Sequence, residues 1–320
     1  MVVLTMAFDM RAPDFGTPAV ALYQAALDQC EWADRCGFHL LSFMEHHAST
    51  DGYLPSPIVM AAAAAGRTKR IGIGVGVMQL PLYNPLRAAE DLAVLDLVSG
   101  GRLRIVVGAG YRTEEYAQFG LELRKRPSLM ERGIDTLKKA WTGEPFEYEG
   151  RTVRILPRPA QQPRPQIVMG GSSKAAAERA ARIADGYSPV APELFEDYRQ
   201  ALAALGRPVP DAPPAQDGYF FLHVSNDPDG DWQKIAPHAL HENNDYAKWL
   251  EGQPNGPYRH VDDPDALRAS GLYRILTPAQ CLELARRNGA MTLKPLIAGL
   301  DPAIAWESLH LFEREVLPHL

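Results

Sequence analysis

The stretch LLSFMEHHASTD, residues 40–51, places ionisable side chains directly after residues with strand character. Residues 40–44 are apolar or small, Glu45, His46 and His47 follow them, and turn-forming residues come next. In α/β proteins, sites are built at the carboxyl ends of parallel strands. The order therefore predicts a buried strand that delivers three ionisable groups to a site, although a structural histidine pair would give the same pattern.

Segments with strand character alternate with helical patterns along the whole chain. No change of composition marks a second domain. The predicted fold is therefore α/β, a (β/α)8 TIM barrel in a single domain of residues 1–320, with the ends of its second to fifth strands converging on one mouth. The eight predicted strands are residues 2–8, 38–44, 70–81, 103–107, 166–169, 186–190, 219–224 and 292–297.

Two segments are predicted to be peripheral insertions. Residues 143–166 contain FEYEGRTVRI, which predicts a small hairpin around Glu149 and Gly150. Residues 225–276 are less regular. His238, His241 and Glu242 lie there at one-turn spacing, which fits metal ligands or the opening of a polar, solvent-facing helix. We prefer the helix and predict no metal site.

Composition excludes several classes of protein. A net charge of −6, spread without charged blocks, gives no sign of a nucleic-acid partner. Three cysteines without CxxC spacing indicate a reducing compartment and no zinc site or disulfide framework. No leader stands out at the first residues, and no apolar run reaches the roughly 20 residues of a membrane span. We therefore expect a cytoplasmic protein that does not contact membranes.

Glycines mark the third and fourth predicted strands. Those at positions 72, 74 and 76 alternate with branched apolar residues, so one face of the third strand carries no side chains. Glycine weakens a strand, and either tight helix packing or the close approach of a flat ligand would explain three on one face. The fourth strand runs into GAGY, residues 108–111, which again exposes backbone.

The fifth predicted strand leads into a candidate phosphate site. It runs into Gly170, Gly171, Ser172 and Ser173, and an alanine-rich helix follows. Backbone N–H groups, two hydroxyls and the positive end of the helix dipole would then point at one place. An ordinary N-cap would explain the serines but not the glycine pair, so we expect the segment to bind a phosphate.

Several long motifs have a recognisable pattern. They are CGFHLLSFMEHH (36–47), the run from IGIGVGV to GAGY (71–111), EEYAQFG (114–120), PQIVMGGSSKAAAERAARIADG (165–186) and TPAQCLELARRNG (277–289). The most distinctive piece is PxxxAExxxxLDxxSGGR at 85–102. On these motifs, which leave out about 215–270, the chain resembles the bacterial-luciferase-like family of flavin-dependent monooxygenases and oxidoreductases.

Carried over residue by residue, the resemblance implies a flavin site. His46 would lie beside the reactive edge of the flavin and handle protons, Glu45 would lie under the isoalloxazine ring, and His47 would support them. A non-prolyl cis peptide is implied between Gly76 and Val77. The residues implied to contact the cofactor are Gly76, Val77, Gly108, Ala109, Gly110, Tyr111, Met169, Gly170, Gly171, Ser172 and Ser173.

One departure from the family concerns the cofactor phosphate. Luciferase has an arginine in the exit loop of the fourth strand, where this chain has Ala109. The phosphate would then depend on backbone groups, on the serines of the fifth strand's exit, and on Arg112 or Arg126. Both FMN and the 5-deazaflavin F420 present a phosphate here, so the residues leave the choice of flavin open.

The implied activity is that of a monooxygenase that uses reduced FMN and dioxygen to oxygenate a small organic substrate. A separate flavin reductase would supply the reduced flavin, since no GxGxxG follows a strand. F420-dependent hydride transfer is the alternative, and a non-catalytic flavin-binding subunit is the third hypothesis. The resemblance also implies a homodimer.

Overall fold

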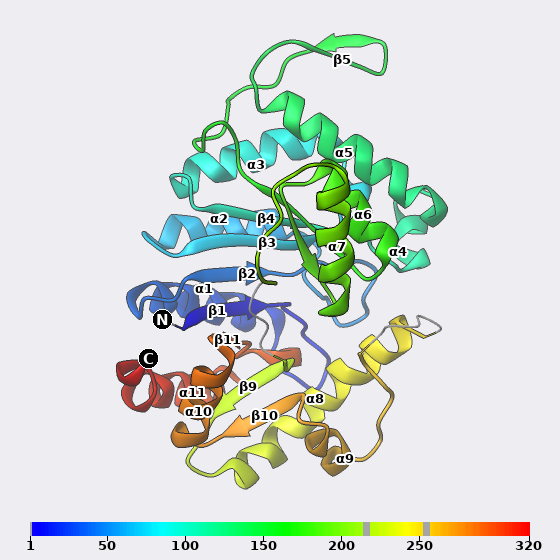
Figure 1. Cartoon of the computed structure of the whole chain (residues 1–320). Helices are drawn as coiled ribbons and strands as arrows, with labels where there is room; N and C mark the ends of the chain where they lie inside the picture. The colour runs from blue at the N-terminus through cyan, green and yellow to red at the C-terminus, as the bar shows by residue number, and fades with distance from the viewer. Residues whose placement is uncertain (1, 214–217, 252–256) are drawn as a thin grey trace. The chain divides into compact units, whose positions relative to one another are not determined.

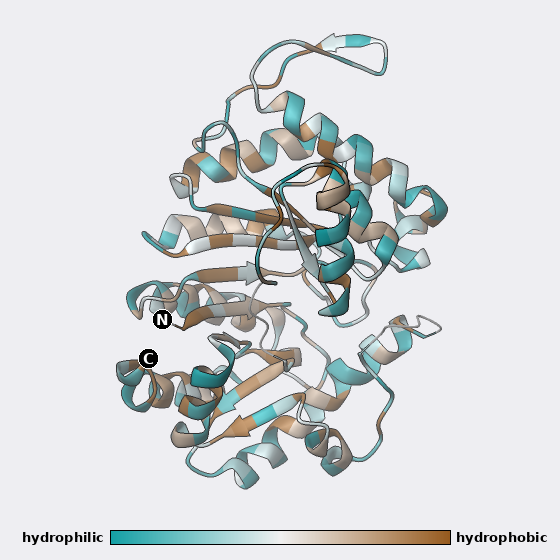
Figure 2. Cartoon of the chain, in the orientation of Figure 1, coloured by the Kyte–Doolittle hydropathy of each residue, from teal (hydrophilic) through white to brown (hydrophobic). Residues whose placement is uncertain are grey.

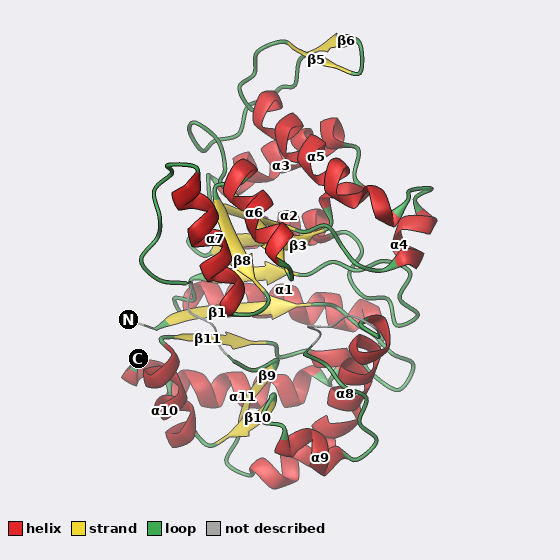
Figure 3. Ribbon diagram, turned by 45° about the vertical axis from the view of Figure 1, so that its right-hand side comes forward, coloured by secondary structure: helices red, strands yellow, loops and turns green. Residues whose placement is uncertain are grey.

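The computed structural model describes residues 2–213, 218–251 and 257–320 (Figure 1). The chain forms two compact units. Unit 1 comprises Met1–Ser42, Ser49–Pro55 and Ala215–Leu320, and unit 2 comprises Phe43–Ala48 and Ser56–Pro214. Both units combine β-strands with helices (Figure 3). The single domain expected for residues 1–320 stays a prediction.

Unit 1 contains two sets of parallel strands. In the first set, β1 lies between β11 and β2, and in the second, β9 pairs with β10. The strands are β1 (Val3–Phe8), β2 (Leu40–Phe43), β9 (Phe221–Val224), β10 (Tyr273–Leu276) and β11 (Ala290–Leu293). The helices are α1 (Ala19–Arg35), α8 (Pro228–Trp249), α9 (Pro264–Ala269), α10 (Pro278–Asn288) and α11 (Pro302–Glu315).

Unit 2 contains four parallel strands that follow one another in sequence order. They are β3 (Gly72–Met78), β4 (Leu103–Val107), β7 (Ile167–Gly171) and β8 (Gly186–Pro189). The helices are α2 (Pro57–Arg67), α3 (Pro85–Ser99), α4 (Thr113–Gln118), α5 (Arg126–Ala140), α6 (Lys174–Ile183) and α7 (Glu193–Ala204). Short 3₁₀ turns, Leu80–Leu82 and Leu123–Lys125, follow β3 and precede α5.

The predicted hairpin is confirmed. β5 (Phe146–Tyr148) and β6 (Arg151–Val153) pair antiparallel across Glu149 and Gly150. Both turn residues have positive φ, 48° and 75°. Two successive positive φ values are what a two-residue hairpin turn of the favoured twist requires.

The most distinctive sequence motif forms α3 and its two ends. Asn84 caps the helix, because its side chain accepts hydrogen bonds from two backbone N–H groups of the first turn, and Pro85 begins that turn. Gly100 and Gly101 end the helix at φ 67° and 83°. Arg102 then donates to backbone carbonyls of α2, of α3 and of the segment before β3. The motif therefore fixes how α3 leads into β4.

Six of the eight predicted strands contain an observed one, whereas the predicted strands 166–169 and 292–297 only overlap β7 and β11, and β10 was not predicted. The α/β class is confirmed. The pairings are parallel except in the β5–β6 hairpin. Closure into an eight-stranded barrel stays a prediction, since β9 is paired with β10 among the described residues. Figure 2 shows brown, hydrophobic residues along β1, β4 and β9, in keeping with their buried side chains, whereas β5 of the exposed hairpin is white and teal.

The expectation of irregular structure in residues 225–276 is wrong. The described part of this segment holds α8, which has 22 residues, together with α9 and β10. The apolar periodicity of α8 is masked because its buried face includes Glu242 and Asn243, and Pro237 lies inside the helix. Searching the described residues, we find no helix long and apolar enough to cross a membrane.

Candidate active site

The stretch after β2 buries its three ionisable side chains, as predicted. Glu45, His46 and His47 belong to unit 2 and are 3%, 8% and 7% exposed. Ala48 follows them at φ 50°, in the left-handed region. Burying three such groups is costly unless each has a partner, and the partners come from the exits of β3 and β4.

His46 is paired with a carboxylate from α4. Its Nδ1 lies 2.7 Å from Oε1 of Glu115, and the same oxygen accepts the backbone N–H of His47 at 2.9 Å. Arg112 donates to the carbonyl oxygen of His47 at 2.7 Å and lies 3.5 Å from Glu115. Burial alone would raise the pKa of Glu115, but the hydrogen bond and charge of His46, the His47 N–H and Arg112 together lower it.

This pairing determines which nitrogen of His46 carries the proton. Because Glu115 is a carboxylate and can only accept, we infer that Nδ1 of His46 is protonated in the neutral ring. Nε2 is then an acceptor. The hydroxyl of Tyr111 lies 3.3 Å from Nε2, and the two rings meet edge to face with centroids 5.5 Å apart.

Glu45 is engaged on both of its oxygens. Oε1 lies 2.7 Å from Nε2 of His47 and accepts the hydroxyl of Tyr83 at 2.9 Å. Oε2 accepts the backbone N–H of Gln79 at 2.8 Å. Burial, together with the charge of Glu45, raises the pKa of Tyr83, which therefore stays a donor. The carboxylate thus ties the end of β2 to the exit of β3.

The predicted cis peptide between Gly76 and Val77 is confirmed. Pairing with β4 shifts register between Gly76 and Met78, so Val77 is a bulged residue, and its side chain is 45% exposed. Two other predicted site residues, Gly108 and Gly170, have no side chain where the side chain of Val77 lies. A Cβ on Gly108 would lie 2.3 Å from Cγ1 of Val77, and one on Gly170 would lie 3.6 Å from Cγ2.

The glycine face of β3 has a packing explanation at one position. A Cβ on Gly76 would lie 3.0 Å from Cβ of Val106 on β4, which is tighter than ordinary contact. Close packing of the neighbouring strand therefore accounts for Gly76. Met169 lies opposite Val107 in the β4–β7 register and is 2% exposed, so its side chain belongs to the core.

The segment after β7 forms the start of α6, as predicted. Ser173 is the N-cap and accepts the N–H of Ala176 at 3.3 Å, so the ordinary capping role is observed. A Cβ on Gly171 would lie 2.5 Å from Cβ of Ala176, which gives that glycine a packing reason as well. Ser172 is exposed beside it. The geometry keeps a hydroxyl and a helix N-terminus at the carboxyl end of β7.

A profile of the luciferase-like monooxygenase family matches residues 3–284. The chain belongs to that family. The resemblance seen in the sequence is thus confirmed. Among curated relatives, the oxygenase component of a flavin-dependent trigonelline monooxygenase from Acinetobacter baylyi is 31% identical over 153 residues, which are 46% of this chain and 42% of the relative. The chain thus spans less than half the length of this relative.

Solved structures of two flavin- or F420-dependent enzymes share the fold. One is the oxygenating constituent of 3,6-diketocamphane monooxygenase from Pseudomonas putida in complex with FMN, with 17% identity, coverage of 100% and 99% of the two chains and a TM-score of 0.75. Another is an F420-dependent secondary alcohol dehydrogenase with an F420–acetone adduct, with 16% identity, full coverage of both chains and a TM-score of 0.68. At these identities the likeness concerns the fold alone.

The family's flavin phosphate is compatible with the residues after β4 and β7. Ser172 and the N-terminus of α6 offer a hydroxyl and the positive end of a dipole. Of the two candidate arginines, Arg112 is buried and donates to the carbonyl oxygen of His47. Arg126 is partly exposed and donates to the carbonyl oxygen of Gly110 at 3.1 Å, while Tyr116 donates to that of Ala109. Each of these groups is a donor of the kind that a phosphate oxygen accepts from.

Sequence reasoning missed the partners of the two histidines. Glu115, Gln79 and Tyr83 were given no role, although all three contact the predicted site. One signal was present for Glu115. An acidic residue in the first turn of a helix, directly after a glycine-rich strand exit, lies at the same sheet edge as a histidine that follows another parallel strand.

Unit 1 contains a second buried group of charges. Arg11 contacts Asp51 at 2.5 Å and Asp245 at 2.9 Å, and its guanidinium is surrounded by the rings of Tyr53, Tyr246 and Trp249. Lys294 lies 2.8 Å from Asp9 and also contacts Glu242. The guanidinium thus already occupies the place between the two carboxylates that, with His241, could otherwise bind a metal.

The three residues that the sequence predicts at the opening of a polar helix, His238, His241 and Glu242, lie on α8. The helix is confirmed, but its solvent-facing character is wrong for Glu242, which is fully buried beside Lys294. His238 contacts the carbonyl oxygen of Ala298 at 2.8 Å, and His241 contacts Asp51 at 2.9 Å.

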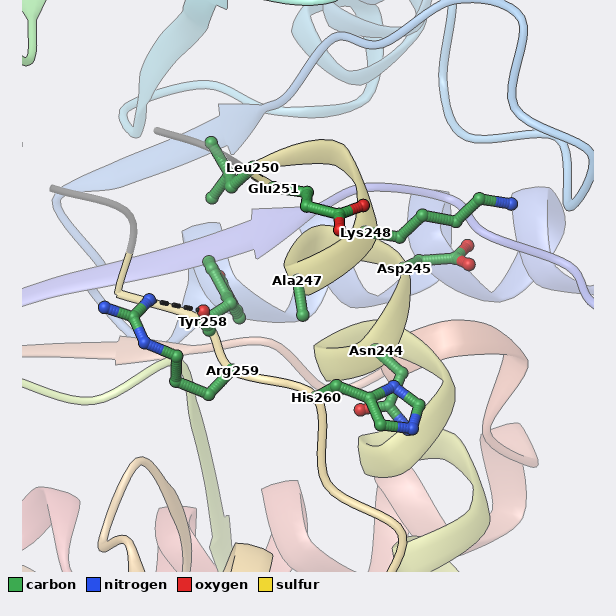
Figure 4. A pocket seen from close by; sticks show the side chains of 9 residues that line it. All are labelled: Asn244, Asp245, Ala247, Lys248, Leu250, Glu251, Tyr258, Arg259 and His260. Carbon is green, nitrogen blue, oxygen red and sulfur yellow. Dashed lines mark hydrogen bonds between the residues drawn. The ribbon is translucent and has the colours of Figure 1, made fainter. Parts of the chain in front are cut away.

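A hollow of about 680 Å³ opens beside α8 and contains none of the predicted site residues (Figure 4). Its lining residues are Asn244, Asp245, Ala247, Lys248, Leu250, Glu251, Tyr258, Arg259 and His260.

Proposed function

We propose that this protein is the oxygenase component of a two-component flavin-dependent monooxygenase. It would take reduced FMN from a separate reductase, use dioxygen and oxygenate a small organic substrate. Membership of the luciferase-like monooxygenase family supports the reaction class, and a relative named as an oxygenase component supports the division of labour. The single observation that carries the proposal is the buried His46, whose Nδ1 proton is fixed by Glu115.

The chain's own residues would bind, orient and move protons. A bound reduced flavin supplies the electrons with which dioxygen is activated. Ser172, the α6 N-terminus and Arg126 would hold its phosphate, and exposed Val77 would support its ring. Glu115 keeps the proton on Nδ1 of His46, so Nε2 is the atom that accepts or donates a proton. Glu45 would act as a positioning residue, because both of its oxygens hold neighbouring groups.

F420-dependent hydride transfer is the second candidate. It is supported by the shared fold of an F420-dependent secondary alcohol dehydrogenase. A phosphate site built from Ser172, the α6 N-terminus and Arg126 does not separate the two cofactors, because both carry a phosphate. FMN and F420 therefore have to be distinguished by the redox reaction that each supports.

Titration of the purified protein with FMN, reduced FMN and F420 under anaerobic conditions tests the proposal. Selective binding of reduced FMN, followed by oxygen uptake when air is admitted with substrate, is the expected result. Selective binding and direct reduction of F420 would instead establish the second candidate. Tight binding of a flavin with no turnover of any substrate would point to a non-catalytic subunit.

Replacing His46 by alanine tests the assigned base. Flavin affinity should stay within several-fold, because no phosphate contact is lost, whereas turnover should fall by roughly 100-fold or more. His260→Ala, at an exposed histidine of unit 1, is the matched control and should retain turnover. Unchanged turnover in His46→Ala would remove His46 from the mechanism.

A homodimer is part of the proposal and has structural support in unit 2. α2 and α3 pack side by side, and Val59, Val94, Leu97 and Val98 are exposed on them. Exposed apolar residues gathered on neighbouring helices are typical of a protein–protein interface. Sedimentation equilibrium should give twice the chain mass, and a monomer at micromolar concentration would count against the dimer.

A further inference from the structure

The hydroxyl of Tyr111 lies beside the reactive nitrogen of His46. Only about 10% of the His46 side chain is exposed, whereas Tyr111, from the exit loop of β4, is partly exposed. Its hydroxyl lies 3.3 Å from Nε2, and its ring packs edge-on against the imidazole at 72°. A reactant that approaches Nε2 therefore meets the Tyr111 hydroxyl.

The direction of this hydrogen bond follows from the other side of the ring. The carboxylate of Glu115 keeps Nδ1 protonated, so Nε2 of the neutral ring has a lone pair and the Tyr111 hydroxyl donates to it. When His46 is protonated, Nε2–H donates and the phenol oxygen accepts. The phenol group can therefore exchange its role without moving. A separation of 3.3 Å is typical of a catalytic contact that shortens when reactants bind.

We infer that Tyr111 is a catalytic residue that relays the proton between His46 and the reactants, an inference that rests on the proposed function. In the relay, the Tyr111 O–H bond breaks as its proton bonds to a basic oxygen of the reactants. At the same time the Nε2–H bond of the imidazolium breaks, and that proton restores the phenol. The net change is one proton moved from His46 to the reactants, with no electron transferred. His46 ends neutral, with its Nδ1 proton still held by Glu115.

The rival role for Tyr111 is that of a cover that has to swing away before Nε2 can act. The two roles predict opposite effects of removing the hydroxyl. If the phenol relays the proton, its loss breaks the only step that joins His46 to the reactants in this scheme. If the hydroxyl instead covers Nε2, its removal exposes the nitrogen, and turnover stays equal or becomes faster.

Tyr111→Phe separates these roles, because the variant keeps the ring that packs on His46. We expect kcat to fall by about 100-fold or more with KM for the organic substrate within a few-fold. Tyr198→Phe, at a buried tyrosine of α7, is the control for loss of a hydroxyl and should leave both constants unchanged. A fall in kcat of less than about tenfold, or a gain, would overturn the relay.

A second measurement needs neither flavin nor substrate. In ¹⁵N-histidine-labelled protein, with the His46 signals assigned by their absence in His46→Ala, the Nε2 resonance should shift in Tyr111→Phe while Nδ1 stays protonated. An unchanged Nε2 resonance would overturn the hydrogen bond on which the relay depends. If the protein proves inactive with every flavin, the proposed function fails by itself, and the resonance still decides whether Tyr111 donates to His46.

Discussion

The packing of Val77 between two glycines gives a quantitative prediction for Gly108→Ala. The added Cβ would lie 2.3 Å from Cγ1 of Val77, while ordinary contact begins near 3.4 Å. Val77 must therefore move by about 1 Å or leave its rotamer. Overpacking of this kind typically costs about 1–3 kcal/mol. We expect Gly108→Ala to lower the free energy of unfolding by that amount.

A matched variant and a double variant isolate the cause. Gly170→Ala adds a Cβ to the other side of Val77 at an ordinary 3.6 Å, so it should change the unfolding free energy by less than about 0.5 kcal/mol. The double variant Val77→Ala/Gly108→Ala no longer has Cγ1 at position 77, and the Cβ that remains there lies 3.7 Å from the Cβ added at position 108. Most of the lost stability should therefore be recovered. Urea titration of the wild type, of these three variants and of Val77→Ala measures the five stabilities, and the double-mutant cycle of Val77→Ala and Gly108→Ala gives the coupling.

Equal stabilities of Gly108→Ala and Gly170→Ala would contradict a clash between residue 108 and Val77, and so would a coupling energy near zero between these two positions. Flavin affinity offers an independent check on the proposed role of Val77. If its exposed side chain supports the flavin ring, Gly108→Ala should also weaken flavin binding several-fold, and Gly170→Ala should not.

Two further predictions concern buried charges of unit 1. Lys294→Met removes the cation that contacts Asp9 and Glu242 and should lower the free energy of unfolding by about 3–5 kcal/mol. The control Lys248→Met, at an exposed lysine, should lower it by less than about 0.5 kcal/mol. Urea titration that finds equal stability in the two would contradict a buried ion pair here. Burial lowers the pKa of His223 from 6.5 to about 4, against the smaller opposing effect of Asp231, so the unfolded chain takes up the proton first as pH falls. Above pH 6.5 the neutral His223 side chain therefore contributes about 3 kcal/mol to the free energy of unfolding, and this contribution is lost as the pH falls to about 4. The pH dependence of unfolding should be shallower over that range in His223→Gln, and an identical slope would exclude the assignment.

Local patterns were enough to predict the elements but not their distant partners. The strand that ends in Glu45, His46 and His47 follows from a few neighbouring residues, and so does the hairpin at Glu149 and Gly150. The contact between His46 and Glu115 joins residues that are 69 apart in the sequence. No local periodicity encodes such a contact, so only the fold could reveal it.

The extent and the buried face of α8 could not be predicted for a different physical reason. Amphipathic helices are recognised by an apolar stripe, whereas the buried face of α8 includes Glu242 and Asn243, each paired with a polar group from another segment. A buried polar residue is stable only when such a partner exists, and these partners, Lys294 and Arg259, lie outside the helix in later segments of the chain. The contact of Arg112 with the carbonyl oxygen of His47, 65 residues away in the sequence, is likewise visible only in the fold.

The contacts of Arg11 have a consequence for the order in which the chain folds. They join β1's exit to Asp245, 234 residues later, and unit 1 as a whole is made from both ends of the chain. Unit 2 comes from residues 43–48 and 56–214. Because distant contacts form slowly and synthesis proceeds from the N-terminus, we expect the unit that carries His46 to be complete while Lys294 is still inside the ribosome. Pulsed hydrogen exchange during refolding should accordingly protect β3 and β4 before β1 and β11.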